Sequence, residues 1–206
     1  MGDIYSTTML ISILIFSFSS FITPGPNNIM LLSSGLSFGY KKTIPHMLGV
    51  ILGFPLMIFA IGVGLNVVFE RYLFIYTLLK IIGSIYLFWM AYKIAYNKGK
   101  YSIDNTNEKN KPFSFIQIVF FQWLNPKAWI MSVTTISIFI SSNENSFYQL
   151  LVICFTHVFI GIISTNTWVL GGVFLKKFIH DEKSIGVFNK TMALLLIISI
   201  VPFLFE

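Results

Sequence analysis

Long apolar runs separated by short polar loops dominate the sequence and most restrict what it can fold into. A helix needs about 20 apolar residues to cross the hydrocarbon core of a bilayer, which is about 30 Å thick. Only 11% of the residues are charged, whereas a soluble domain has roughly 25%. The pattern therefore predicts an all-α membrane protein with six transmembrane helices, at 8–35, 44–68, 72–95, 114–140, 147–175 and 187–204.

The positive charges fall mostly on one side of these predicted spans. Of the 14 Lys and Arg residues, eleven lie on one side, in loops or near the ends of spans, Arg71 lies on the other, and Lys80 and Lys127 lie deeper inside spans. Short loops rich in Lys and Arg stay in the cytoplasm, which predicts a multi-pass protein of the cytoplasmic membrane with both termini outside. Because the basic residues form no clustered face, the expected surroundings are the lipid bilayer and not a nucleic acid.

A polar segment at 96–113 divides the single predicted transmembrane domain into two halves of three spans each, 1–95 and 114–206. Because three is an odd number, the two halves must enter the membrane in opposite directions. A weak internal repeat agrees with this, since residues 21–26 resemble residues 121–126. The sequence thus predicts two inverted three-helix repeats joined by a cytoplasmic linker, with the first and fourth helices interrupted.

The first predicted interruption contains Pro24, Gly25 and Pro26, followed by Asn27 and Asn28. Proline lacks an N–H and its ring clashes with the preceding turn, so two prolines around a glycine should break a helix. Within a membrane, such a break is tolerated only where protein or a water-filled cavity satisfies the freed backbone groups. The two asparagines are expected to cap the following half-helix, to contact a substrate, or to do both.

The second predicted interruption contains Asn125, Pro126 and Lys127. Asn125 is expected to be the N-cap of a half-helix, with Pro126 at its first position. The positive ends of the two half-helices would converge near the middle of the membrane. Lys127 would lie at the same depth, where a lysine is disfavoured by about 2.5–3.5 kcal/mol and should face a cavity or a partner. No predicted span contains Asp or Glu, so we expect a cationic pocket for a substrate carboxylate.

Four further polar residues lie in or near the spans. Asn166 is expected either to be a second polar contact of the substrate or to form a helix–helix hydrogen bond. His157 is the candidate for proton coupling because histidine titrates near neutral pH. Lys80 is a second coupling candidate, with snorkelling to the interface as the alternative. His46 is expected to be solvated at the cytoplasmic mouth of the second span.

Several function classes do not fit the residue set. The single cysteine, Cys154, can form neither an intramolecular disulfide nor a two-cysteine redox relay. A cation or metal carrier remains the alternative function, but spans without Asp or Glu leave few ligands, and no metal site is expected. The sequence offers no nucleophile with a base and an orienting group. It therefore predicts neither an enzyme nor a bound cofactor.

Several motifs resemble the lysine exporter/homoserine exporter (LysE/RhtB) family. They are TPGPNNIMLLSSGLSFGYKK, the glycines at 49 and 53, KIIGSIYLFWMAYK and QWLNPKAW, and they cover nearly the whole chain in the family's order. The resemblance implies a six-span secondary carrier of the bacterial cytoplasmic membrane that exports amino acids and uses the proton gradient. It leaves open whether the protein forms a homo-oligomer.

The two asparagines after PGP, with Asn166 and Trp168, are most similar to the cysteine and O-acetylserine exporters of that family. Many members of the family have Asp directly after PGP, where this chain has Asn27. An acidic proton carrier is therefore absent at that position.

Overall fold

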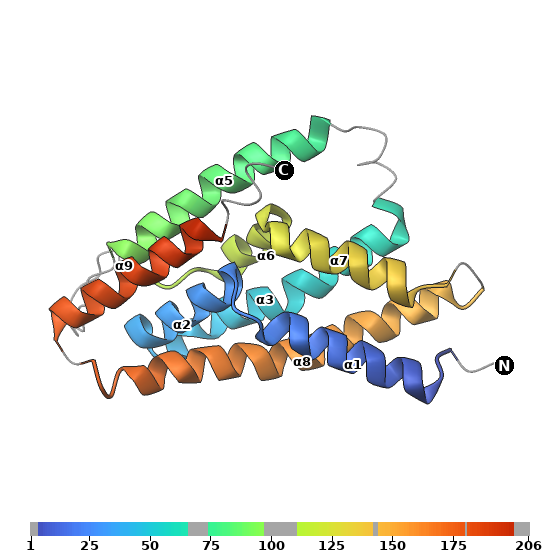
Figure 1. The fold of residues 1–206 in the computed structure, drawn as a ribbon, viewed down its shortest axis with the longest axis horizontal. Coiled ribbons are helices and arrows are strands. Elements are labelled where there is room, and N and C mark those ends of the chain that lie inside the picture. The colour runs from blue at the N-terminus through green and yellow to red at the C-terminus, as the bar shows by residue number, and fades with distance from the viewer. Residues whose placement is uncertain (1–3, 66–73, 97–110, 142–143, 180, 200–206) are drawn as a thin grey trace.

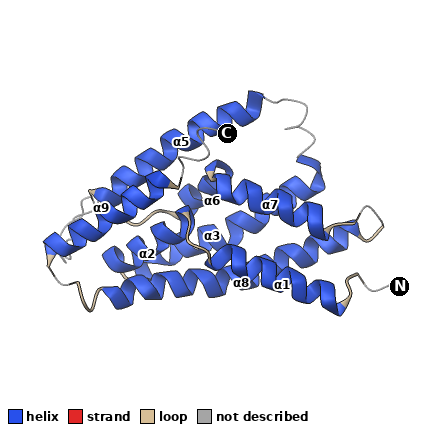
Figure 2. Ribbon diagram, viewed as in Figure 1, coloured by secondary structure: helices blue, strands red, loops and turns tan. Residues whose placement is uncertain are grey.

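The computed structural model describes residues 4–65, 74–96, 111–141, 144–179 and 181–199. Every regular element within these ranges is a helix (Figure 2). In chain order, the elements are α1 (Thr7–Ile22), α2 (Pro26–Phe38), α3 (Tyr40–Ala60), the short π-helix η1 (Ile61–Leu65), α5 (Phe74–Ala95), α6 (Phe115–Leu124), α7 (Pro126–Phe139), α8 (Ser146–Leu175) and α9 (Glu182–Ile198). Figure 1 shows α1, α2, α3 and α8 running along the long axis of the molecule, with α5 and α9 paired along one side.

Both predicted interruptions are present. The chain leaves helical geometry after α1 and re-enters it at Pro26, and α2 is bent by 57° relative to α1. In the second half, α6 ends at Leu124 and α7 begins at Pro126. Proline alone does not cause these breaks, because α3 continues through Pro45 and Pro55. The Pro-Gly-Pro sequence and the Asn-Pro sequence are what end the helices.

Two helices in the described parts of the chain, at Tyr40–Gly64 and Ser146–Leu175, are long and apolar enough to cross a membrane. The bent pair α1 and α2 qualifies as a third span if it is counted as one. The prediction of six spans remains a prediction. The sixth helix differs from expectation at its start, since α9 begins at Glu182 and not at 187. The reason is a polar first turn capped by Asp181, whose carboxylate accepts the Ser184 amide at 2.8 Å.

Helix α2 is the innermost element, with ten of its thirteen residues buried. It packs against α8 through glycines on both helices. A Cβ on Gly35 would overlap the Val169 carbonyl, and a Cβ on Gly172 would overlap the Leu32 carbonyl. This close approach of two backbones is typical of small residues in membrane helix pairs. It fixes α2, and therefore the first break, against α8.

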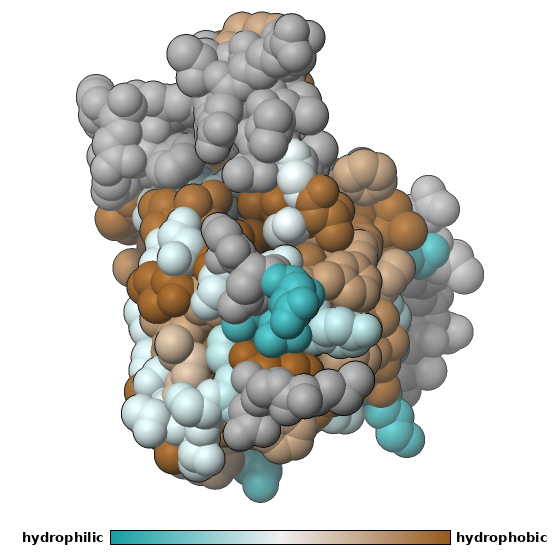
Figure 3. Space-filling model, turned by 90° about the vertical axis from the view of Figure 1, so that its right-hand side faces the viewer, coloured by the Kyte–Doolittle hydropathy of each residue, from teal (hydrophilic) through white to brown (hydrophobic). Residues whose placement is uncertain are grey.

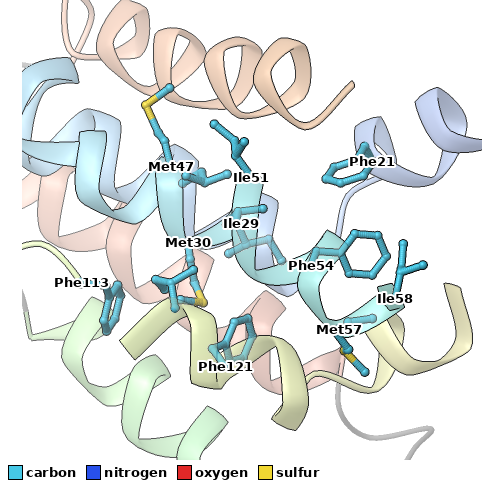
Figure 4. Close-up of a cluster of buried hydrophobic side chains, with 14 of the residues drawn as sticks. Phe21, Ile29, Met30, Met47, Ile51, Phe54, Met57, Ile58, Phe113 and Phe121 are labelled. Atoms are coloured by element: carbon cyan, nitrogen blue, oxygen red, sulfur yellow. The ribbon is translucent and has the colours of Figure 1, made fainter. Parts of the chain in front are cut away.

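Helix α3 packs against α6 in a similar way. A Cβ on Gly49 would lie 2.6 Å from Cβ of Ile118, so only glycine allows the observed spacing. Around this contact the buried apolar side chains form one cluster, in which Met30 of α2 and Phe121 of α6 approach each other (Figure 4). The cluster holds the four helices that carry the two breaks in a fixed arrangement.

The outer surface is apolar, as expected of a chain surrounded by lipid. Large side chains such as Ile15, Phe120 and Phe155 are each more than 60% exposed. The end that carries the N-terminus shows few strongly hydrophilic residues among its coloured atoms (Figure 3). The opposite end, at the left of Figure 1, holds the ends of α2, α5 and α8 and the starts of α3 and α9.

Most of the described lysines lie at or near that left-hand end: Lys41, Lys42, Lys93, Lys111, Lys176, Lys177 and Lys183. This placement agrees with the charge asymmetry on which the predicted orientation rests. Most of the predicted linker, 97–110 of 96–113, lies outside the described residues, so the predicted domain division stays a prediction.

Candidate functional site

The first break exposes backbone carbonyls at the end of α1, and side chains from other helices satisfy them. Nδ2 of Asn28 donates to the carbonyl oxygens of Phe21 at 2.7 Å and Thr23 at 2.8 Å. The Ser164 hydroxyl of α8 donates to the same Phe21 oxygen at 3.0 Å. The break is therefore a built feature whose polar groups have partners, as a membrane environment requires.

The backbone amides at the start of α2, in contrast, have no side-chain cap. Gly25 is the N-cap in an extended conformation, and no side chain caps this helix. The expectation that Asn27 and Asn28 cap α2 is therefore wrong. Both lie inside the first turn, where Pro26 takes the first position, and Asn28 turns back to α1 instead. The α2 N-terminus keeps its partial positive charge and the uncapped amides of Asn27 and Asn28.

The second break has the predicted geometry. Asn125 is the N-cap of α7, and its Oδ1 accepts the Lys127 amide at 3.2 Å. Pro126 occupies the first helical position. The carbonyl of Trp123, just before the break, accepts the indole N–H of Trp129 at 2.8 Å. Here, too, the half-helix after the break supplies a donor to the one before it.

The two breaks meet. Nζ of Lys127 donates to the Thr23 carbonyl oxygen at 2.7 Å. Gly25 leaves room for this lysine, because a Cβ there would lie 2.9 Å from Cδ and 3.2 Å from Nζ of Lys127. Asn27 and Gln122 exchange two amide hydrogen bonds of 2.9 and 3.2 Å between α2 and α6. Residues about 100 positions apart in the sequence thus form one site.

A pocket lies at this junction, with a volume of about 350 Å³ that includes the part open to solvent. Three pairs of its lining residues are 100 positions apart: Gly25 and Asn125, Asn27 and Lys127, and Asn28 and Ala128. The remaining lining residues are Ser20, Phe21, Val50, Phe54 and Met131. Lys127 is the only charged residue among those that line the pocket. Its positive charge rests on a backbone carbonyl, which is a neutral acceptor.

Asn166 is not among the residues that line this pocket. Asn166 accepts the Tyr40 hydroxyl at 2.6 Å and donates to the Ile162 carbonyl at 2.7 Å. It therefore forms the helix–helix hydrogen bond that was one of its two expected roles. The backbone of Lys80 belongs to α5, and its side chain lies outside the described residues.

His157 lies one layer behind the pocket and is fully buried. Its ring is 5.9 Å from that of Phe21 and 5.7 Å from that of Phe54, and both phenylalanines line the pocket. Nδ1 donates to the Ile153 carbonyl at 2.8 Å, so in the neutral ring Nε2 accepts the Ser17 hydroxyl at 3.3 Å.

His46 is also fully buried, so the expectation of a solvated residue is wrong. The second helix begins at Tyr40, earlier than predicted, which places His46 well inside α3. There its ring packs edge-on against Phe113.

Three residues that form hydrogen bonds at the two breaks were not predicted from the sequence: Thr23, Gln122 and Ser164. Gln122 carried a signal, because it is a polar residue in an apolar span directly before the break. Thr23 contributes only its carbonyl, which its side chain does not reveal. Within the described ranges, no group of three or more His, Cys, Asp or Glu residues could hold a metal ion.

Comparison with known proteins gives the family. The profile of the LysE type translocators matches residues 18–205. A cysteine/O-acetylserine efflux protein from Salmonella choleraesuis is 28% identical over 178 residues, which is 85% of this chain and 87% of that protein. One of the same description from Escherichia coli O1:K1 is 28% identical over 192 residues, 92% of this chain and 94% of that protein. No solved structure matches the chain significantly. The chain belongs to the LysE type translocator family and is a multi-pass membrane transporter, not an enzyme.

Proposed function

We propose that this transporter exports small zwitterionic amino acids, of the cysteine and O-acetylserine kind, across the bacterial cytoplasmic membrane. The similarity to cysteine/O-acetylserine efflux proteins supports the substrate class. The observation that carries the proposal is the junction of the two breaks. There the Lys127 ammonium group, whose one hydrogen-bond partner among the described residues is a carbonyl, lies beside the N-terminus of α2, which no side chain caps.

In this proposal the substrate exchanges partners with the protein. Its carboxylate binds Nζ of Lys127 and the uncapped amides of Asn27 and Asn28, because a helix N-terminus and a lysine both favour an anion. Lys127 leaves the Thr23 carbonyl, and the α-ammonium group of the substrate takes its place there. Each charge of the zwitterion then has a partner, and no acidic side chain is required.

The proposed architecture is two inverted three-helix repeats, 1–95 and 114–206, with both termini outside. Support comes from the pocket residues spaced by 100 positions. It also comes from packing between equivalent helices, since α3 contacts α8 and α5 contacts α9.

The orientation can be tested with Gly2→Cys, Asn105→Cys and Glu206→Cys in a Cys154→Ser background, labelled on intact cells with an impermeant maleimide. Labelling at 2 and 206 but not at 105 is expected. Labelling at 105 alone would reverse the orientation.

We further propose proton coupling without an intramembrane carboxylate, with His157 as the first candidate. It lies directly behind Phe21 and Phe54 of the pocket. Lys80 is the second candidate. In His157→Gln, transport driven by a pH gradient should be lost while substrate counterflow is retained. Full gradient-driven transport in this variant would exclude the histidine route.

The function itself is tested by counterflow in proteoliposomes that contain the purified protein. Vesicles preloaded with cysteine, O-acetylserine or another small neutral amino acid should accelerate entry of labelled substrate, and the corresponding amines without a carboxylate should not. Acceleration by divalent cations, with none by amino acids, would support the alternative of a cation carrier and refute the proposed function.

A further inference from the structure

A second pocket lies at the lysine-bearing end of the molecule. Its volume is about 330 Å³, including the part open to solvent. It is formed by α2, the last turn of α5 and the segment just before α6. The lining residues are Ser33, Ser34, Phe38, Lys93, Ile94, Lys111 and Phe113.

The chemistry of this pocket is that of an anion site. Lys93 and Lys111 supply two positive charges, and no Asp or Glu is among the lining residues. Lys93 is held in place by aromatic rings, because its Nζ lies 4.6 Å from the centre of the Trp89 ring and 5.5 Å from that of Phe113. Cation–π contacts of this kind orient an ammonium group without neutralising it.

Helix α2 connects this pocket to the pocket at the breaks. Asn28 lines the first pocket, and Ser33 lines the second. They are five positions apart, which is about 7.5 Å along a helix. Ser34 and Ser37 follow, and all four side chains are buried. Ser33 donates to Oδ1 of Asn189, whose Nδ2 donates to Ser37. The buried polar groups of α2, the helix that lines both pockets, therefore form part of a hydrogen-bonded network, as polar groups inside a membrane protein require.

A buried histidine lies directly behind the second pocket. Nδ1 of His46 is 3.1 Å from the hydroxyl of Ser34, and its ring is 5.7 Å from that of Phe113. Among the described residues, Nε2 of His46 has no hydrogen-bond partner. Buried polar atoms almost always have partners, so this histidine, which contacts the lining residues Ser34 and Phe113, retains unused hydrogen-bonding capacity.

We propose that the second pocket is a carboxylate-binding station at the lysine-bearing mouth, where a small amino acid binds before it moves along α2 to Lys127. The station rests on the proposed function, since it takes the same substrate on the side from which export begins. The phosphate of an anionic lipid has similar chemistry, so the test must separate the two sources.

The test uses inside-out membrane vesicles, in which the lysine-bearing end faces the added amino acid under the proposed orientation. The double variant Lys93→Gln/Lys111→Gln should raise the half-saturation concentration about tenfold, because two partly solvated charge contacts are lost. The maximal rate should stay within about twofold of the wild type, because Lys127 is intact. Lys93→Arg/Lys111→Arg should keep most of the affinity. Lys183→Gln removes an exposed charge that does not line the pocket, and it should have no effect.

Lys127→Met in the same vesicles separates this inference from the proposed function. If Lys127→Met lowers transport while the double variant keeps the half-saturation concentration of the wild type, the station is refuted and the proposed function stands. If Lys127→Met also transports like the wild type, the binding model at the breaks fails. Should the double variant fail to assemble, Lys111→Gln alone decides, because this exposed residue precedes α6. A half-saturation concentration unchanged in Lys111→Gln would then refute the station.

To test whether the pocket binds a lipid phosphate instead, transport is measured with the purified protein in vesicles of phosphatidylcholine, with and without phosphatidylglycerol. The affinity loss of the double variant should be the same in both compositions. A loss that occurs only with phosphatidylglycerol would assign the pocket to a lipid phosphate and overturn the proposal.

Discussion

The two helix breaks occupy matched positions in the sequence but contribute different chemical groups. The first, around Gly25, contributes backbone: the Thr23 carbonyl and the uncapped amides at the start of α2. The second contributes side chains: Asn125 caps its own helix, and Lys127 reaches across to the first break. Neither break alone brings these groups together. In the function we propose, the receptor for a zwitterion forms only where the two breaks are in contact.

The composition of each break explains this division. Two prolines in the first break remove two amide donors, so the carbonyls at the end of α1 need donors from elsewhere. Asn28, Ser164 and Lys127 supply them. Pro26 and Pro126 both occupy the first position of the new helix, where a missing amide costs nothing, so Pro24 is the proline that sets the first break apart. In the second break the residue before the proline is Asn125, whose side chain caps α7.

Removal of the lysine at the second break should have the largest effect. Lys127→Met abolishes a charged contact worth about 1.5–3 kcal/mol, so export at low substrate concentration should fall about 10- to 100-fold. Insertion should be intact, because a charge in the membrane is itself unfavourable. Initial rates and the amount of protein in the membrane measure the two effects. Lys183→Met is the matched control, and an equal loss there would mean that general charge, and not the site, matters.

A side chain at Gly25 should have the next largest effect. In Gly25→Ala, the new Cβ would crowd Cδ of Lys127 and push the ammonium away from Thr23. We expect a three- to tenfold loss of export, roughly the effect of a small overpacking strain. Gly186→Ala is the control, since a Cβ there meets nothing within 4 Å. Export at wild-type rates in Gly25→Ala would show that the contact between the breaks is unimportant.

The donors to the Phe21 carbonyl should show strong coupling. Asn28→Ala and Ser164→Ala each leave the other donor in place, whereas the double variant leaves a buried carbonyl unpaired. The loss in the free energy of unfolding should exceed the sum of the two single losses by about 1 kcal/mol. Unfolding in mixed detergents measures it. Simple additivity would mean that Phe21 finds another donor, such as water.

Loss of the cap at the second break should have the smallest effect. Asn125→Ala removes the side-chain bond to the Lys127 amide and should cost about 0.5–1 kcal/mol of stability. The cost is at the low end because the Asn125 carbonyl still accepts the Ala128 amide. Asn125→Ser should restore the cap. The comparison of the two breaks would need revision if Asn125→Ala destabilised the protein more than the Asn28→Ala/Ser164→Ala double variant.

The sequence predicted what depends on local chemistry. Both breaks and the Asn125 cap follow from the conformational limits of Pro, Gly and Asn within a few residues. The mid-span depth of Lys127, which the apolar run around it predicts, stays a prediction. The prediction that the two breaks converge followed from the inverted repeat, and the structure brings Gly25 and Lys127 together.

Contacts set by tertiary packing were not predictable in this way. The partner of Lys127 is a backbone carbonyl 104 residues away, and no side chain marks it. The burial of His46 depends on Phe113 and Ser34, which come from separate elements. Asn28 donates back to the Phe21 and Thr23 carbonyls, and its position in the sequence does not indicate this direction.

The most direct test of the account combines Lys127→Met with a substrate amide, which has no carboxylate charge. Binding of the amino acid and its amide is measured in the wild type and in the variant, which gives a double-mutant cycle. We expect the amide to bind the wild type about tenfold more weakly than the amino acid, or more weakly still. The amide should lose little further affinity in Lys127→Met, because both changes remove the same contact. Fully additive losses would mean that Lys127 and the carboxylate do not meet, and would refute the proposed binding site.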